Sequence, residues 1–104
     1  MTKRHRIGDR DSFAQGVTQV EIGRREICVV RIDDAFYAIG DRCSHQDVSL
    51  SDGELDADDL TIECPKHGAS FSLESGQPLS LPPTQPVPTY DVVIEGDAIY
   101  LEMN

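Results

Sequence analysis

Short apolar runs bounded by turn-forming residues recur along the whole chain of 104 residues, a pattern typical of β-strands. We expect strands over 18–22, 26–32, 35–39, 60–64, 69–73, 90–95 and 98–102. Asp33-Asp34 and Gly96-Asp97 lie between neighbouring strands and predict the turns of two β-hairpins. Helical periodicity is missing except over 11–15, where we expect one turn of helix.

Proline is concentrated in one segment, because 74–89 holds five of the six prolines. Proline has no backbone N–H to donate to a sheet ladder, so we expect an extended loop here. A strand pair follows this loop and must return to the body of the domain, so the loop should wrap over its surface. The predicted fold is a small all-β protein, an antiparallel β-sandwich, in a single domain spanning 1–104.

The chain is strongly acidic, with 9 basic and 19 acidic side chains, a net charge of −10 and a pI near 4.4. Such a surface repels phosphate backbones and anionic lipids, so we expect neither nucleic-acid nor membrane binding. Seven acidic and no basic residues lie between Asp47 and Glu63, whereas 1–25 holds six basic and three acidic residues. The acidic stretch is either a solvated loop or a face that steers a basic partner into contact.

The beginning of the chain and the cysteine count indicate a cellular compartment. The segment 1–10 lacks the apolar run of a secretory signal, and no stretch approaches the ~18 apolar residues of a membrane helix. Three cysteines, an odd number, also argue against a disulfide framework. We therefore expect a cytoplasmic protein.

Two Cys/His pairs carry the candidate chemistry. They are Cys43-Ser44-His45 and Cys64-Pro65-Lys66-His67, with 18 residues between them. Two cysteines and two histidines satisfy structural zinc, but zinc modules usually keep the cysteines together and the histidines together. The alternative is a site with two iron atoms, in which each loop gives one thiolate to one iron and one imidazole to the other. We expect Cys28, which lies mid-strand among apolar residues, to be a buried small hydrophobe and not a fifth ligand.

On these motifs the sequence resembles the Rieske [2Fe-2S] family, with its C-x-H…C-x-x-H ligand pattern. The likeness continues in four short stretches: Phe36-Tyr37-Ala38-Ile39, Ser49-Leu50-Ser51-Asp52-Gly53, Ser70-Phe71 and Ser75-Gly76. The proline-rich loop and the final hairpin also fit the family. It implies one [2Fe-2S] cluster, with Cys43 and Cys64 on one iron and His45 and His67 on the other. It also implies a two-loop cluster-binding tip on the sandwich, over about 40–72.

The branch of the family is indicated by four further positions. Respiratory-complex Rieske proteins carry an extra cysteine in each ligand loop, and these form a disulfide; the matching residues here are Val48 and Lys66. Those proteins also place a Ser and a Tyr after the second loop, which donate hydrogen bonds to the cluster; here Ala69 and Phe71 match. The resemblance is therefore to the soluble, low-potential ferredoxins.

The resemblance implies a one-electron carrier and not an enzyme, taking electrons from a flavin-dependent reductase and passing them to a terminal non-haem iron oxygenase. Such contacts are transient, so we expect a monomer without a stable complex. The chain is not the oxygenase, since two of its three histidines belong to the cluster. Three alternatives stay open: a small subunit of a nitrite-reductase-type complex, an accessory ferredoxin of cluster assembly, and a zinc-stabilised interaction module.

Overall fold

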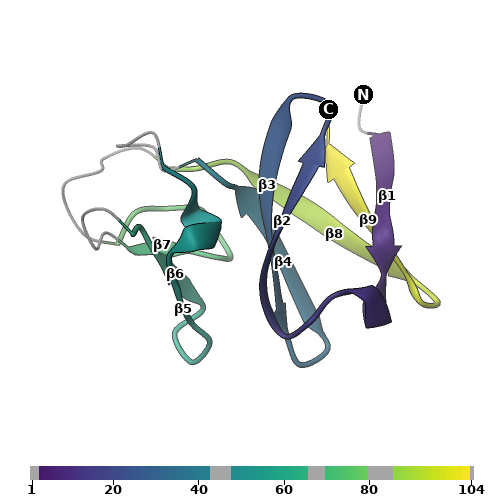
Figure 1. Cartoon of the computed structure of the whole chain (residues 1–104), viewed down its shortest axis with the longest axis horizontal. Coiled ribbons are helices and arrows are strands. Elements are labelled where there is room, and N and C mark those ends of the chain that lie inside the picture. Colours follow the sequence, from purple (N-terminus) through teal and green to yellow (C-terminus); the bar gives the residue numbers. More distant parts are fainter. Residues whose placement is uncertain (1–2, 43–47, 66–69, 80–85, 104) are drawn as a thin grey trace.

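The computed structural model describes residues 3–42, 48–65, 70–79 and 86–103 (Figure 1). This part of the chain contains antiparallel β-strands and no α-helix, so the predicted all-β fold class is confirmed. The strands are β1 (Lys3–Asp9), β2 (Gly16–Ile22), β3 (Arg25–Ile32), β4 (Ala35–Gly40), β5 (Glu54–Asp56), β6 (Thr61–Glu63), β7 (Ser70–Ser72), β8 (Thr89–Glu95) and β9 (Ala98–Met103). Two 3-10 turns, η1 (Arg10–Ser12) and η2 (Leu50–Asp52), accompany them.

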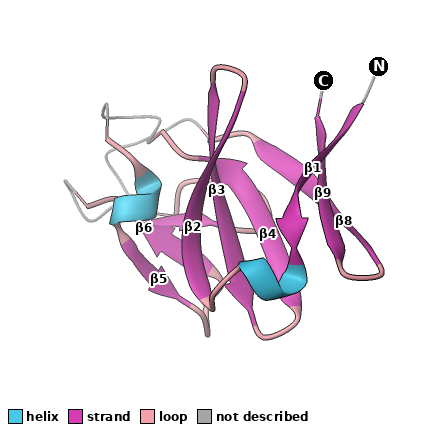
Figure 2. Ribbon diagram, turned by 45° about the vertical axis from the view of Figure 1, so that its right-hand side comes forward, coloured by secondary structure: helices cyan, strands magenta, loops and turns pink. Residues whose placement is uncertain are grey.

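The strands form a six-stranded sheet in the order β1-β9-β8-β4-β3-β2 and a three-stranded sheet in the order β5-β6-β7. Strand β8 joins the two halves of the large sheet. Its beginning pairs with Ala38 and Ile39 of β4, and its remainder pairs with β9. Because β8 leaves β4 so soon, the β1-β9-β8 half turns away and encloses apolar side chains together with the β2-β3-β4 half (Figure 2).

Strand β3 shows how two cores fit into one small chain. Its side chains alternate between the two faces of the sheet, and both faces are covered. Ile27 and Val29 point into the large-sheet core, whose buried members are Phe13, Ile27, Val29, Phe36, Ala38, Ile99 and Leu101. Cys28 and Val30 point into the small-sheet core, whose buried members are Cys28, Val30, Ile39, Leu50, Ile62, Cys64, Phe71, Leu73 and Val87. Burial on both faces explains the unbroken apolar run of β3.

Both predicted hairpins are present, at the β3–β4 and β8–β9 connections. Asp33 takes a positive φ of 54°, and Gly96 takes one of 61°. A positive φ is costly for a residue with a Cβ atom. Asp33 is held there by Gln15, whose side-chain carbonyl accepts the Asp33 N–H at 2.7 Å and whose amide donates to the Asp33 carbonyl at 3.1 Å.

Two strands were not expected from the sequence. Strand β1 is rich in charge and lacks apolar alternation, yet it pairs with β9, and Arg4 forms ion pairs with Glu95 and Glu102 across the sheet. Strand β5 lies in the acidic stretch between the two predicted ligand loops, where no strand is expected from the sequence. The predicted helical turn at 11–15 is found slightly earlier, as η1.

The proline-rich segment 74–89 is described at both ends, and each end is fixed to the domain. Pro78 forms a bridge with Phe71, and the Pro88 carbonyl accepts the Gly40 N–H at 2.7 Å. The segment between its described ends, 80–85, lies outside the described residues. In the described ends no strand forms before Thr89, which agrees with the predicted loop.

Candidate metal centre

Of the four predicted ligands, Cys64 lies in the part of the chain that the structure describes; Cys43, His45 and His67 lie outside it. Cys64 directly follows β6 and is 1% exposed. It forms no disulfide and belongs to the small-sheet core. A free, dry thiol at a strand end is a suitable donor for a buried metal cluster.

The first predicted ligand loop is closed at its base. Arg42 and Ser49 form an isolated antiparallel bridge on the two sides of 43–47. The next residue, Leu50, donates its N–H to the Asp41 carbonyl and buries its side chain completely in the small-sheet core. The two ends of this segment are therefore held together, independently of any metal.

The bases of the two predicted ligand loops also touch each other. A Cβ atom added at Gly53 would lie 1.7 Å from the carbonyl oxygen of Glu63, the residue before Cys64. Only glycine permits so close an approach of the two backbones. Leu50 and Cys64 meet in the small-sheet core as well. The described stems thus lie side by side, as a two-loop tip requires.

Segment 70–79, which follows the second predicted ligand loop, folds back on itself. The Leu79 N–H donates to the Ser70 carbonyl at 2.8 Å, and Phe71 is completely buried in the small-sheet core. Phe71 has no hydroxyl group, so its side chain supplies no hydrogen-bond donor to this region.

The predicted acidic stretch forms an exposed acidic face, and three of its carboxylates, Asp52, Glu54 and Glu63, line a hollow together with Cys64. The described members of this face are Asp52, Glu54, Asp56, Asp58, Asp59 and Glu63, all of them exposed. Glu54 and Glu63 are direct partners across β5 and β6, where like charges repel. Among the described residues no lysine or arginine forms an ion pair with these carboxylates. No cation of the described ranges therefore offsets the charge of this face.

Cys28 has the environment expected of an inert thiol. It is 0% exposed, and burial together with the charge of Asp41 raises the pKa of Cys28 to about 12. A thiol of this kind stays protonated at neutral pH and does not compete for metal. The prediction that Cys28 is a buried small hydrophobe is confirmed.

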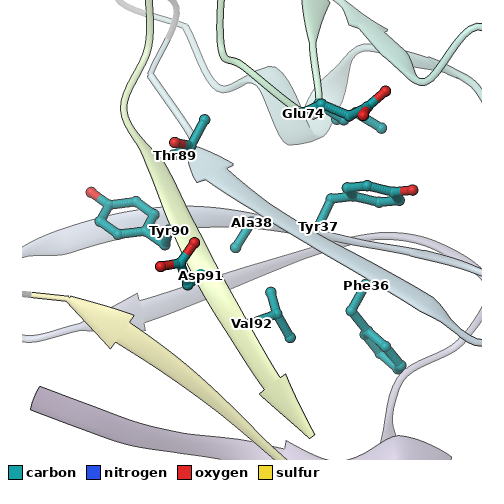
Figure 3. Close-up of a pocket in the computed structure, with 9 residues that line it drawn as sticks. Phe36, Tyr37, Ala38, Glu74, Thr89, Tyr90, Asp91 and Val92 are labelled. Carbon is teal, nitrogen blue, oxygen red and sulfur yellow. The ribbon is translucent and has the colours of Figure 1, made fainter.

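A separate groove lies where β8 leaves β4. Figure 3 shows side chains of both strands around it, with Tyr37 on β4 and Tyr90 and Asp91 on β8, and Glu74 at its rim. Its residues include none of the predicted ligands, and the carboxylates of Glu74 and Asp91 are exposed. The described lining of this groove therefore gives no reason to place a metal site there.

Asp41, a buried carboxylate just before the first predicted ligand loop, is a residue of this region that the sequence does not identify. Its position two residues before Cys43 was a signal, but nothing in the sequence shows that the side chain is buried. No cluster of three or more metal-binding side chains occurs within the described ranges. Three of the four predicted ligands lie outside these ranges.

The donor set fits a Rieske cluster. Two thiolates and two imidazoles are its ligands, and Cys64 offers its sulfur from a dry core. The mixed order of cysteine and histidine in each loop, together with stems that meet, agrees with one shared two-iron centre.

Comparison with known proteins gives a consistent result. The sequence model of the Rieske [2Fe-2S] domain matches residues 3–91. The 3-phenylpropionate/cinnamic acid dioxygenase ferredoxin subunit of Escherichia coli (strain K12) is 48% identical over 77 residues, 74% of this chain and 72% of that protein. The ferredoxin of carbazole 1,9a-dioxygenase from Nocardioides aromaticivorans IC177 superposes with a TM-score of 0.90 at 37% identity, covering 94% of this chain and 95% of that one.

A further solved structure is a complex of reduced oxygenase and oxidised ferredoxin in carbazole 1,9a-dioxygenase. One of its chains superposes with a TM-score of 0.84 at 33% identity, covering 93% of this chain and 99% of that one. The family match confirms the predicted [2Fe-2S] cofactor and favours it over structural zinc. The names of the relatives agree with an electron carrier rather than a catalytic enzyme. No helix in the described ranges is long and apolar enough to cross a membrane.

Proposed function

Because the chain belongs to the Rieske [2Fe-2S] domain family, we propose that it is the ferredoxin component of an oxygenase system. It passes single electrons from a flavin-dependent ferredoxin reductase to a terminal non-haem iron oxygenase. Its likeness to dioxygenase ferredoxin subunits is the observation that carries this proposal. The solved complex of a similar ferredoxin with its oxygenase supports the second partner.

Cys43 and Cys64 bind one iron of the cluster in this proposal, and His45 and His67 bind the other. The burial of Cys64 and the contact between the two loop stems support this assignment. The whole chain 1–104 then forms one domain, with its cluster-binding region over about 40–72. When bound, the cluster accepts and releases one electron.

The chain's own residues shape this site in four ways. The small-sheet core excludes water from the Cys64 side, and the stems fix the two loops relative to each other. Phe71 supplies no hydrogen bond that would stabilise the reduced form, and the acidic face disfavours added negative charge. We expect a potential near the low end of the Rieske range, roughly −150 mV.

The acidic face explains how partners find the site. The exposed carboxylates of this face, of which Asp52, Glu54 and Glu63 lie beside Cys64, attract basic surfaces over about 8 Å at physiological salt. A partner with a basic patch is steered toward the tip and released again after electron transfer. Such brief encounters agree with a monomeric protein in the cytoplasm.

The test is reconstitution. Protein purified without oxygen should contain two irons and two acid-labile sulfides, and dithionite should bleach its visible absorption. Added to a flavin reductase and a Rieske-type oxygenase, it should be required for product formation, and rising salt should slow its reduction. A colourless zinc protein, or one that supports nitrite reduction and no oxygenase, contradicts the proposal.

A further inference from the structure

Asp41, directly after β4, is the one charged side chain that is completely buried in the described part of the chain. Burying a carboxylate costs free energy unless hydrogen bonds replace its water. Its Oδ1 accepts the backbone N–H of Ser51 at 2.8 Å. Its Oδ2 accepts the Ser51 hydroxyl at 3.1 Å and the side-chain amide of Gln19. Both oxygens of the carboxylate are thus satisfied.

The donors around Asp41 are all neutral. Arg42, its neighbour in the chain, forms its ion pair with Glu26 at 2.9 Å. None of the ion pairs between described residues includes Asp41. A backbone N–H and an amide N–H can only donate. The described partners of the carboxylate are therefore dipoles, and no described cation contacts it.

Asp41 lies at the base of the first predicted ligand loop, where its backbone also forms hydrogen bonds. The Asp41 N–H donates to the Glu26 carbonyl at 3.1 Å, and the Asp41 carbonyl accepts the Leu50 N–H. Together with its bonds to Ser51, these contacts join the segment before 43–47 to the segment after it. Asp41 holds the base of the first ligand loop with its main chain and its side chain alike.

We propose that Asp41 is a positioning residue of the redox site, whose buried carboxylate fixes the first ligand loop and whose charge, which no described cation contacts, lowers the reduction potential of the cluster. This inference rests on the proposed ligation by Cys43 and His45. A fixed negative charge in a poorly polarisable interior makes the addition of an electron less favourable. The charge already acts on a second group in the small-sheet core, since it helps to raise the pKa of Cys28.

The first test is Asp41→Asn in the cluster-loaded protein. The variant keeps the shape and removes the charge, while the Asn oxygen still accepts the Ser51 N–H and the new NH₂ group donates to the Ser51 hydroxyl. The Gln19 amide keeps its bond to Glu26 and loses only its bond to Asp41. We expect the midpoint potential, measured by voltammetry, to shift to a more positive value. We also expect chelators to remove the cluster several-fold faster than from the wild-type protein.

The matched control is Asp52→Asn, which removes an exposed carboxylate of the same region. Its potential shift should be smaller and should vanish in about 1 M salt, where screening acts over only about 3 Å. The shift of Asp41→Asn should persist, because a buried charge is screened much less. A salt-independent difference between the two variants identifies the buried charge as its source.

A second variant, Ser51→Ala, keeps the charge and removes one donor that offsets it. Its potential should shift to a more negative value, opposite in sign to that of Asp41→Asn, so this variant decides the question if Asp41→Asn does not fold. Faster cluster loss with an unchanged potential in both variants overturns the electrostatic role. An unchanged rate of loss in Asp41→Asn overturns the positioning role. Failure of the proposed function is distinct, since the wild-type protein itself then holds no cluster.

Discussion

The two cores of this protein are built in different ways. The large-sheet core is purely hydrocarbon and is formed mainly by strands of six to eight residues with regular pairing. The small-sheet core contains two cysteines and lies under strands of only three residues each. Leu50, Leu73 and Val87 reach it from turns and loops. Regular strand pairing holds the first core, and single specific contacts hold the second.

This difference separates stability from function. Deleting one contact in a regular sheet leaves many others in place, whereas the tip depends on the close backbone contact at Gly53 and on the hydrogen bonds of Asp41. The tip also borrows β3 and β4 from the large sheet as its floor, because both faces of β3 are covered. We expect damage to the large-sheet core to affect the whole protein, and damage to the tip to affect the cluster first.

The largest effect should come from a ligand, Cys64→Ala, compared with Cys28→Ala. Both side chains are buried cysteines of the small-sheet core. Cys64→Ala should abolish the visible absorption and the bound iron, since one thiolate ligand is lost. Cys28→Ala should keep both, because its protonated thiol is not a ligand. Iron analysis of the two purified proteins decides the matter, and a loaded cluster in Cys64→Ala contradicts the ligand assignment.

A comparison of Ile99→Ala with Ile62→Ala tests the two cores directly. Both side chains are 0% exposed, one in each core, so each deletion should cost about 2–5 kcal/mol. Ile99→Ala should lower the free energy of unfolding while the folded fraction keeps a normal rate of cluster loss. Ile62→Ala should speed that loss under a chelator. Equal rates of cluster loss in the two variants, measured by absorption, contradict a separate role for the small-sheet core.

The sequence predicts the large-sheet region better than the tip. Apolar runs and the Asp33-Asp34 and Gly96-Asp97 turns predict the β3–β4 and β8–β9 hairpins, because local pairing decides these elements. Strand β1 escapes prediction because its pairing with β9 comes from the far end of the chain. An edge strand can carry charge on both faces, so no alternation marks it.

The ligand motifs are visible in the sequence because metal chemistry demands fixed residue types at fixed spacings. The contacts that hold these motifs in place are not visible in the sequence. The burial of Asp41 and the contact of Gly53 with Glu63 depend on how segments distant in the chain pack, and a lone Asp or Gly carries no such signal. Strand β5 is similar, because a segment of three residues is too short to show a strand pattern and is a strand only through its pairing with β6.

Gly53→Ala should have an intermediate effect. The added methyl group meets the Glu63 carbonyl, so the stems must separate, at a cost of about 1–3 kcal/mol. The control is Gly23→Ala in the β2–β3 turn, where the methyl meets nothing within 4 Å but the positive φ of 62° is strained, at a cost of about 1–2 kcal/mol. Both variants should be less stable in urea, and only Gly53→Ala should lose its cluster faster. Faster loss from Gly23→Ala removes the distinction between the two regions.

The smallest effect is the contribution of the Cys28 thiol to the pH dependence of the free energy of unfolding. Its pKa is raised from 9.0 to about 12 in the folded protein, so the unfolded chain releases this proton first as the pH rises. Between these values the unfolded state binds fewer protons, and the free energy of unfolding should fall by about 1.4 kcal/mol per pH unit. Below pH 9 this contribution to stability is fully present. Urea unfolding between pH 8 and 10.5 measures the slope against Cys28→Val, which is one methyl group larger, stays apolar and has no proton to release. Identical slopes in the two proteins mean that the small-sheet core does not hold Cys28 as a neutral thiol, and that it is wetter than its burial implies.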